Sequence, residues 1–66
     1  MISDQRHQTI INLLEDLGAV TVSDLVKEFK VSEMTIRRDL DILENQGLLR
    51  RVHGGAVSRR GRSYEP

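Results

Sequence analysis

Arginine is the residue type in this 66-residue sequence with the clearest capacity to bind a ligand, and it is unevenly distributed. Seven of its eight arginines fall within residues 34–66, where four carboxylates oppose them and leave a net charge of +3. Residues 1–33 carry −3, so the whole chain is neutral. The planar guanidinium fork suits phosphate oxygens and guanine edges. We therefore interpret the chain as an acidic scaffold half and an arginine-rich half for a nucleic-acid partner; a merely solvated charged surface is the alternative.

One segment concentrates the side chains that could contact DNA. Its candidates are Ser32, Met34, Thr35, Arg37 and Arg38. Around them, Ile36, Leu40 and Leu43 recur at the spacing of one helical face. At about 100° per residue, Met34 and Arg38 fall within about 20° of the opposite face. The pattern predicts a helix over 32–46, capped by Ser32, that can enter a major groove with its N-terminus first.

Other residues of this helix have structural interpretations. Arg37 has Glu33 four residues before it and Asp41 four after it, but exposed pairs of this kind contribute only about 0.3–0.5 kcal/mol. Asp39 lies near the core edge, where we expect it to hold an arginine or a backbone group; a base contact is the alternative. Ile42 is expected to pack under the segment that follows.

Two earlier helices are expected to support this one. The first covers Asp4–Leu17, with Ser3 as its N-cap and Gly18 just beyond its end. The second covers Val22–Phe29 and begins at a capping box in which Thr21 precedes Asp24 by three positions. Only the three residues 30–32 separate it from the next helix, which favours the steep crossing of a helix-turn-helix.

Residues 48–58 predict a β-hairpin, called the wing below. Two apolar runs flank Gly54-Gly55, a dipeptide suited to a two-residue turn. Arg50, Arg51 and His53 lie on or beside it and, together with Gly54, are candidates for contact with phosphates or a minor groove. The alternative is a hairpin that only covers the core.

Composition excludes several classes of function. There is no cysteine, and His7 and His53 stand far apart, so neither a metal site nor a cofactor is expected. No spacing brings an acid, a base and a nucleophile together, which argues against an enzyme. No long apolar run predicts a membrane segment, and a cytoplasmic setting is expected. Single-stranded RNA binding would need stacking aromatics, whereas Phe29 is assigned to the core and Tyr64 to the tail.

Two segments resemble the N-terminal DNA-binding domain of the DeoR family of bacterial transcription regulators. They are SEMTIRRDL at 32–40 and GLLRRVHGGAV at 47–57, with Arg6, Ile10 and Leu14 in register. The resemblance implies a mainly α fold with a small β-hairpin, namely a winged helix-turn-helix of three helices plus wing over residues 1–58. It also implies sequence-specific binding of double-stranded operator DNA. By matching positions, Ser32, Thr35, Arg37 and Arg38 would contact DNA from the helix, and Arg51, His53 and Gly54 from the wing.

The family further implies a repressor of carbohydrate or related metabolic genes, associated with the bacterial nucleoid. Its members carry a C-terminal effector domain for a sugar phosphate or similar metabolite, and that domain is expected to make the full-length protein a homo-oligomer. Residues 59–66 are interpreted as the linker toward it, which makes this chain an excised DNA-binding domain. The main alternative is a winged helix that binds a protein and not DNA.

One residue departs from the family pattern. Lys30 stands in the turn where members often have glycine. If the turn requires a positive φ, lysine carries a strain of about 1–2 kcal/mol there.

Overall fold

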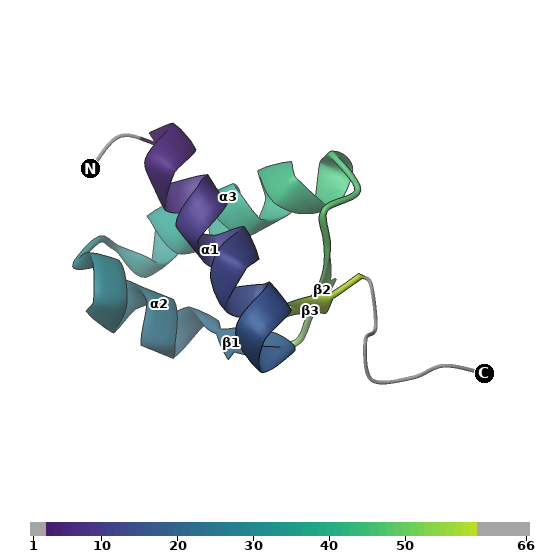
Figure 1. Ribbon diagram of the computed structural model, residues 1–66. Helices are drawn as coiled ribbons and strands as arrows, with labels where there is room; N and C mark the ends of the chain where they lie inside the picture. Colours follow the sequence, from purple (N-terminus) through teal and green to yellow (C-terminus); the bar gives the residue numbers. More distant parts are fainter. Residues whose placement is uncertain (1–2, 60–66) are drawn as a thin grey trace.

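Three helices and three short strands follow one another in the order αβααββ (Figure 1). The helices are α1 (Ser3–Leu17), α2 (Val22–Phe29) and α3 (Glu33–Asn45). The strands are β1 (Ala19–Thr21), β2 (Leu49–Val52) and β3 (Gly55–Ser58). This computed structural model describes residues 3–59, and it confirms the predicted winged helix-turn-helix. Within those residues, no helix is both long and apolar enough to cross a bilayer.

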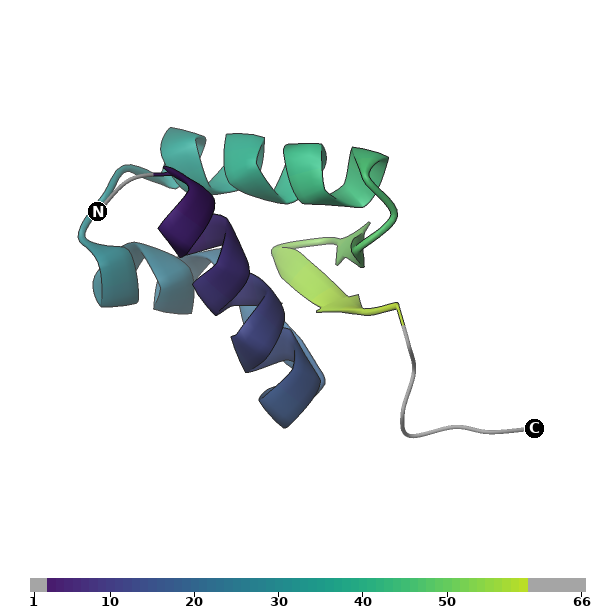
Figure 2. The same ribbon diagram turned by 45° about the horizontal axis from the view of Figure 1, so that its top comes forward.

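The first helix runs diagonally across α2 and α3, as Figures 1 and 2 both show. The core lies where the three helices meet the sheet. Its completely buried side chains are Ile10, Leu14, Leu25, Ile36, Leu40, Leu43 and Leu49. Each predicted helical stripe contributes to this set. Leu17, which has the spacing of the stripe on α1, is the exception and is 68% exposed at the end of that helix.

The boundaries of α2 and α3 follow the predicted capping residues. Thr21 Oγ1 accepts a hydrogen bond from the Asp24 N–H at 3.0 Å, and Ser32 Oγ accepts one from the Thr35 N–H at 3.1 Å. Lys30 ends α2 in the left-handed region at φ 57°, with its N–H bonded to the Val26 carbonyl oxygen. The turn therefore does require a positive φ at a residue that is not glycine. Ser3 is the first residue of α1, whose predicted start was Asp4.

The sheet differs from the prediction in having a third strand. Strand β3 lies in the middle, antiparallel to both β1 and β2. A strand of three residues is too short to show an alternating pattern, which is why Ala19–Thr21 was not predicted to be one. Pairing of β1 with β3 ties the wing to the segment between α1 and α2, so the wing is part of the main body of the fold.

The turn of the wing is His53-Gly54, one residue earlier than the predicted Gly54-Gly55. Val52 and Gly55 are paired across the hairpin, and Gly54 has φ +82°. Gly55 lies within β3, where an added Cβ would overlap the Val20 carbonyl oxygen and lie 2.9 Å from the Thr21 Cα. The second glycine is therefore required by the close approach of β1, and the first by the turn.

Two further expectations have different outcomes. Ile42 was expected to pack under the wing, but 37% of its surface is exposed, because its position on α3 lies outside the stripe that meets the core. The linker predicted for 59–66 lies, apart from Arg59, outside the described residues.

Candidate nucleic-acid interface

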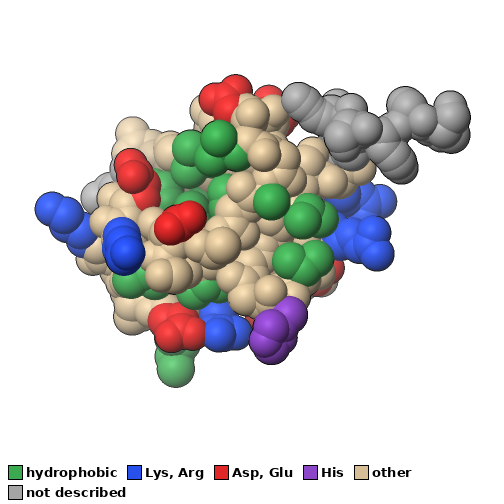
Figure 3. Space-filling model, turned by 90° about the horizontal axis from the view of Figure 1, so that it is seen from below, with side chains coloured by type: hydrophobic (Ala, Val, Ile, Leu, Met, Phe, Trp, Pro, Cys, Tyr) green, Lys and Arg blue, Asp and Glu red, His purple; other side chains and the backbone are tan. Residues whose placement is uncertain are grey.

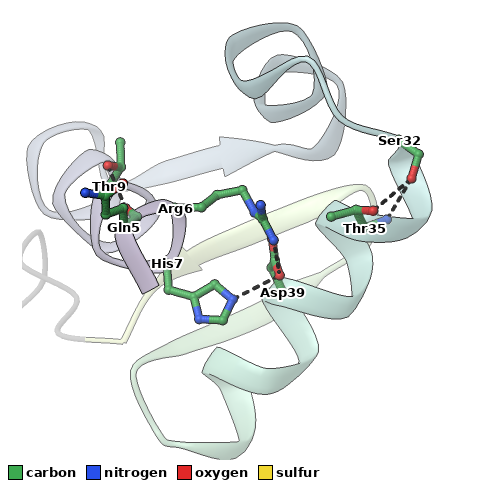
Figure 4. A network of polar contacts seen from close by, with 7 residues as sticks. All are labelled: Gln5, Arg6, His7, Thr9, Ser32, Thr35 and Asp39. Atoms are coloured by element: carbon green, nitrogen blue, oxygen red, sulfur yellow. Dashed lines mark hydrogen bonds and ion pairs between the residues drawn. The ribbon is translucent and has the colours of Figure 1, made fainter. Parts of the chain in front are cut away.

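The first turn of α3 is ordered by two hydroxyl groups. Ser32 Oγ and Thr35 Oγ1 lie 3.0 Å apart, and Ser32 Oγ also accepts the Thr35 N–H (Figure 4). Since one hydroxyl donates to the other, a single hydroxyl hydrogen of the pair is left for an external acceptor. The cap thus fixes the start of the helix and leaves one donor at its N-terminal end.

Met34 and Arg38 lie four residues apart on α3 and define what we call its outward face. Met34 is 71% exposed, and Arg38 is exposed as well. Within residues 3–59, the guanidinium of Arg38 has no hydrogen bond or ion pair with another side chain. An arginine without an intramolecular partner can turn toward an external acceptor without first breaking a contact.

The neighbouring Arg37 is held in place. Its Nε and Nη2 donate to Glu33 Oε2 at 3.0 and 2.6 Å, the predicted pairing with the residue four positions earlier. Both side chains are at least half exposed, so the pair contributes little to stability and can be exchanged for a phosphate. Arg37 therefore has an ion-pair partner and Arg38 has none within residues 3–59, although the two are adjacent in the sequence.

Asp39 points in the opposite direction, into the contact between α1 and α3. Arg6 Nε and Nη2 donate to its two carboxylate oxygens at 2.5 and 3.2 Å, and His7 Nε2 lies 2.9 Å from Oδ1 (Figure 4). This confirms the expectation that Asp39 holds an arginine. Burial disfavours the charged carboxylate, but the hydrogen bonds from Arg6 and His7 outweigh it and lower the pKa of Asp39.

The role of Arg6 and His7 was not anticipated from the sequence. Arg6 is buried and His7 is partly buried, and both project from the first two turns of α1. The available signal was an arginine that precedes the apolar stripe of α1 by four residues. Together these contacts fix the angle at which α3 is held, because they join it to α1 through a buried charge.

Of the two wing arginines, Arg51 has a side-chain partner and Arg50 has none within the described residues. Arg51 pairs with Asp41 through Nη1, and its backbone N–H donates to Glu44 Oε2 at 3.0 Å. Arg50 is exposed and, in the described part of the chain, makes no side-chain hydrogen bond or ion pair. Two carboxylates of α3 thus anchor β2, and the wing and the helix form one unit.

The tip of the wing touches the start of α2. The Gly54 carbonyl oxygen accepts the Val22 N–H at 2.9 Å. Beside this contact lies a shallow groove of about 380 Å³, lined by Val22, Ser23, Val26, Lys27, Glu33, Arg37 and Gly54. The structure therefore brings Arg37 and Gly54 of the wing turn to the same groove. His53, the other residue of that turn, is exposed.

Ser23 and Lys27 are additional polar residues of this groove that were not selected from the sequence. They are four residues apart on α2, and both are exposed, while Val22 and Leu25 face the core. Their helical spacing was the signal that could have identified them. They add a hydroxyl and an ammonium group next to Arg37.

Charge is mixed on the molecular surface. Figure 3 shows Lys and Arg side chains at both ends of one face, with Asp and Glu side chains among them and small separate groups of hydrophobic side chains. The predicted separation into an acidic and a basic half is therefore only partial. Carboxylates from α3 pair with Arg6, Arg37 and Arg51, so Arg38 and Arg50 are the arginines of α3 and the wing that remain unpaired within the described residues.

Comparison with known proteins gives a family match. The profile of the DeoR-like helix-turn-helix domain matches residues 6–61. The chain is 44% identical over 66 residues to an uncharacterized HTH-type transcriptional regulator, FruR, of Bacillus subtilis, and covers 26% of that protein. It is 45% identical over 58 residues to the lactose phosphotransferase system repressor of Streptococcus mutans, with 88% of this chain and 23% of the relative covered.

A third relative is the glycerol-3-phosphate regulon repressor of Escherichia coli, which is 50% identical over 57 residues. That match covers 86% of this chain and 23% of the relative. The chain thus spans about a quarter of the length of these curated relatives. No solved structure gives a significant match.

Proposed function

Because the chain belongs to the DeoR-like helix-turn-helix family of DNA-binding transcription regulators, we propose that it binds double-stranded operator DNA sequence-specifically on behalf of a bacterial repressor. The observation that carries this proposal is the outward face of α3, where Arg38 is exposed and has no side-chain partner among residues 3–59, beside an ordered N-terminal cap. A recognition helix contacts base edges from its N-terminal residues. An unpartnered guanidinium there can donate two hydrogen bonds to guanine O6 and N7.

The proposed contacts come from three elements: α3, the wing and α2. Arg38, Met34 and Thr35 face the bases, whereas Ser32 and Arg37 contact the phosphates at the start of α3. The wing supplies backbone or minor-groove contacts through Arg50, Arg51, His53 and Gly54. Arg37 and Arg51 reach a phosphate after leaving Glu33 and Asp41, since both ion pairs include an exposed carboxylate. Ser23 and Lys27 add phosphate contacts from α2, the helix that crosses the backbone in this motif.

The regulated genes are proposed from the relatives. Two of them are named as repressors of a lactose phosphotransferase system and of a glycerol-3-phosphate regulon. We extend this to carbohydrate or related metabolic genes as the targets, with a sugar phosphate or similar metabolite as the effector. In this proposal, effector binding and oligomerisation belong to a C-terminal effector domain of the kind that the family implies. The protein acts in the cytoplasm on the chromosome, as a regulator and not as an enzyme.

Titration against a random-sequence duplex at about 50 and 200 mM salt tests the proposal. We expect binding at low salt that weakens steeply with salt, because each neutralised phosphate releases about 0.9 of a counterion. Selection from a random duplex pool then gives the preferred site and the spacing of half-sites. Absence of binding at low salt would favour the alternative function of a winged helix that binds protein.

A further inference from the structure

Met34 is the most exposed large hydrophobic side chain among those of the described residues. The others are Leu17, Ile42, Leu48 and Val52. Of these, only Ile42 shares α3 with Met34, and it lies two turns farther from the N-terminus with 37% of its surface exposed. The fold does not use Met34, since the α3 contribution to the core comes from Ile36, Leu40 and Leu43. Its side chain at the start of α3 therefore does not contribute to the core.

The surroundings of Met34 restrict what an apolar side chain can do there. It is the second residue of α3, one turn before the unpartnered Arg38 and next to the Ser32–Thr35 hydroxyl pair. Every other candidate on this part of the helix carries a hydroxyl or a charge. A helix that enters the major groove with these residues first necessarily brings the Met34 thioether chain to the base edges as well.

The base edges of the major groove offer one distinctive apolar group. Guanine, cytosine and adenine present hydrogen-bond donors and acceptors, whereas thymine adds its C5 methyl group. Methionine is unbranched and polarizable, so it can adjust its rotamer to cover such a methyl. An exposed methionine in the groove gains contact area against thymine, but it would remove water from the polar edge of a guanine or an adenine without replacing the hydrogen bonds.

We propose that Met34 is a specificity-determining residue that selects a thymine by packing against its C5 methyl group, next to the base pair contacted by Arg38. This inference rests on the proposed function, because it assigns a base preference to the same recognition helix. Arg38 reads polar atoms and Met34 reads an apolar one, so the two residues distinguish base pairs by independent chemistry.

Replacing thymine by deoxyuridine tests the proposal, since it removes only the methyl group. On the selected duplex, each thymine is replaced in turn, and the dissociation constants of the wild-type chain and of Met34→Ala are compared. We expect one position in a half-site at which uracil weakens the wild-type chain about 3- to 5-fold, the value of one buried methyl group. Met34→Ala should show no uracil penalty at that position.

Three variants serve as controls. Ile42→Ala removes an exposed apolar side chain from the same helix and should keep the wild-type uracil penalty. Arg38→Ala should bind both duplexes more weakly, but the ratio of its dissociation constants for the uracil and thymine duplexes should equal the wild-type ratio. Met34→Leu should restore part of the penalty that Met34→Ala loses. The inference is overturned if the wild-type chain tolerates uracil at every thymine, or if Met34→Ala retains the penalty. Either result leaves duplex binding intact, whereas failure of the proposed function would appear as no binding of any duplex.

Discussion

At the scale of single residues, adjacent side chains of α3 have opposite tasks. Arg37 is held by Glu33, Arg38 is free of partners within the described chain, and Asp39 is buried against α1. Successive residues of a helix point about 100° apart, so Arg37 pairs at the surface, Arg38 lies on the outward face of α3 and Asp39 faces the core. The run Arg37-Arg38-Asp39 thus places two proposed DNA contacts directly beside a contact that packs α3 against α1.

Arg38→Ala should weaken binding to the selected site by about 1–3 kcal/mol and relax the preference at one base pair. The reason is the loss of a bidentate contact to a base, which discriminates among base pairs. The measurement is a set of dissociation constants on single-base variants of the site. Equal weakening on every duplex, random ones included, would show that Arg38 contacts a phosphate.

Arg6→Ala should destabilise the domain by about 3 kcal/mol at pH 7, because it leaves the buried Asp39 carboxylate without its main partner. The pKa of Asp39 is lowered in the wild-type protein, so its contribution is present above the unfolded value of about 4 and is lost as the pH falls through the folded pKa. In Arg6→Ala, protonation of Asp39 relieves the unpaired charge. The difference in unfolding free energy between the two proteins should therefore shrink from pH 7 toward pH 3.

Urea unfolding followed by circular dichroism across this pH range gives the comparison. Arg6→Met combined with Asp39→Leu is the matched control, since an apolar pair of similar volume should retain stability at pH 7. A difference between Arg6→Ala and wild type that stays constant with pH would contradict a role for the Asp39 charge.

At the scale of secondary-structure elements, the turn between α2 and α3 keeps a strained residue. Lys30 occupies φ 57°, where a side chain costs about 1–2 kcal/mol. Lys30→Gly removes that strain but adds about 0.5–1 kcal/mol of backbone entropy to the unfolded chain. A net stabilisation of up to about 1.5 kcal/mol is expected, seen as a higher melting temperature. Lys30→Ala keeps the Cβ and should give no gain; an equal gain from both variants would place the effect in the lysine side chain.

The contact between wing and α3 predicts the effect of a second substitution. Asp41→Asn should tighten binding to random duplex by up to about fivefold, because it removes a negative charge and frees Arg51 for a phosphate. The same substitution in an Arg51→Ala background should have a much smaller effect, measured by fluorescence anisotropy at fixed salt. Glu15→Gln, which neutralises an exposed carboxylate on α1, is the control. Equal tightening with and without Arg51 would show that Arg51 stays away from DNA.

Prediction from the sequence was most successful where a periodic or capping signal existed. The apolar spacing and the caps Thr21 and Ser32 located α2 and α3, since both signals are local. The sequence could not indicate β1, because this strand forms only by pairing with β3. In the Val20–Ala56 pair the two residues are 36 positions apart in the sequence. The sequence predicted an arginine partner for Asp39, but it could not identify Arg6 and His7, nor Asp41 as the partner of Arg51, because these contacts join elements that only the fold brings together.

At the scale of the whole molecule, a neutral chain can still present a binding site for a polyanion. Carboxylates of α3 pair with Arg6, Arg37 and Arg51, so within residues 3–59 the arginines of α3 and the wing that remain unpaired are Arg38 and Arg50. We expect this arrangement to limit non-specific attraction to DNA, because the guanidinium groups of Arg37 and Arg51 must first leave their carboxylate partners. Specificity is then expected to depend more on the outward face of α3 than on total charge.

The ratio of affinities for selected and random duplex, at one salt concentration, tests this account most directly. We expect the 66-residue chain to bind the selected site about 10³-fold more tightly than random duplex, the lower end of the usual range. Arg38→Ala should reduce that ratio at least tenfold while changing affinity for random duplex much less. Equal affinity for both duplexes, or a ratio that Arg38→Ala leaves unchanged, would contradict recognition of base pairs by the outward face of α3.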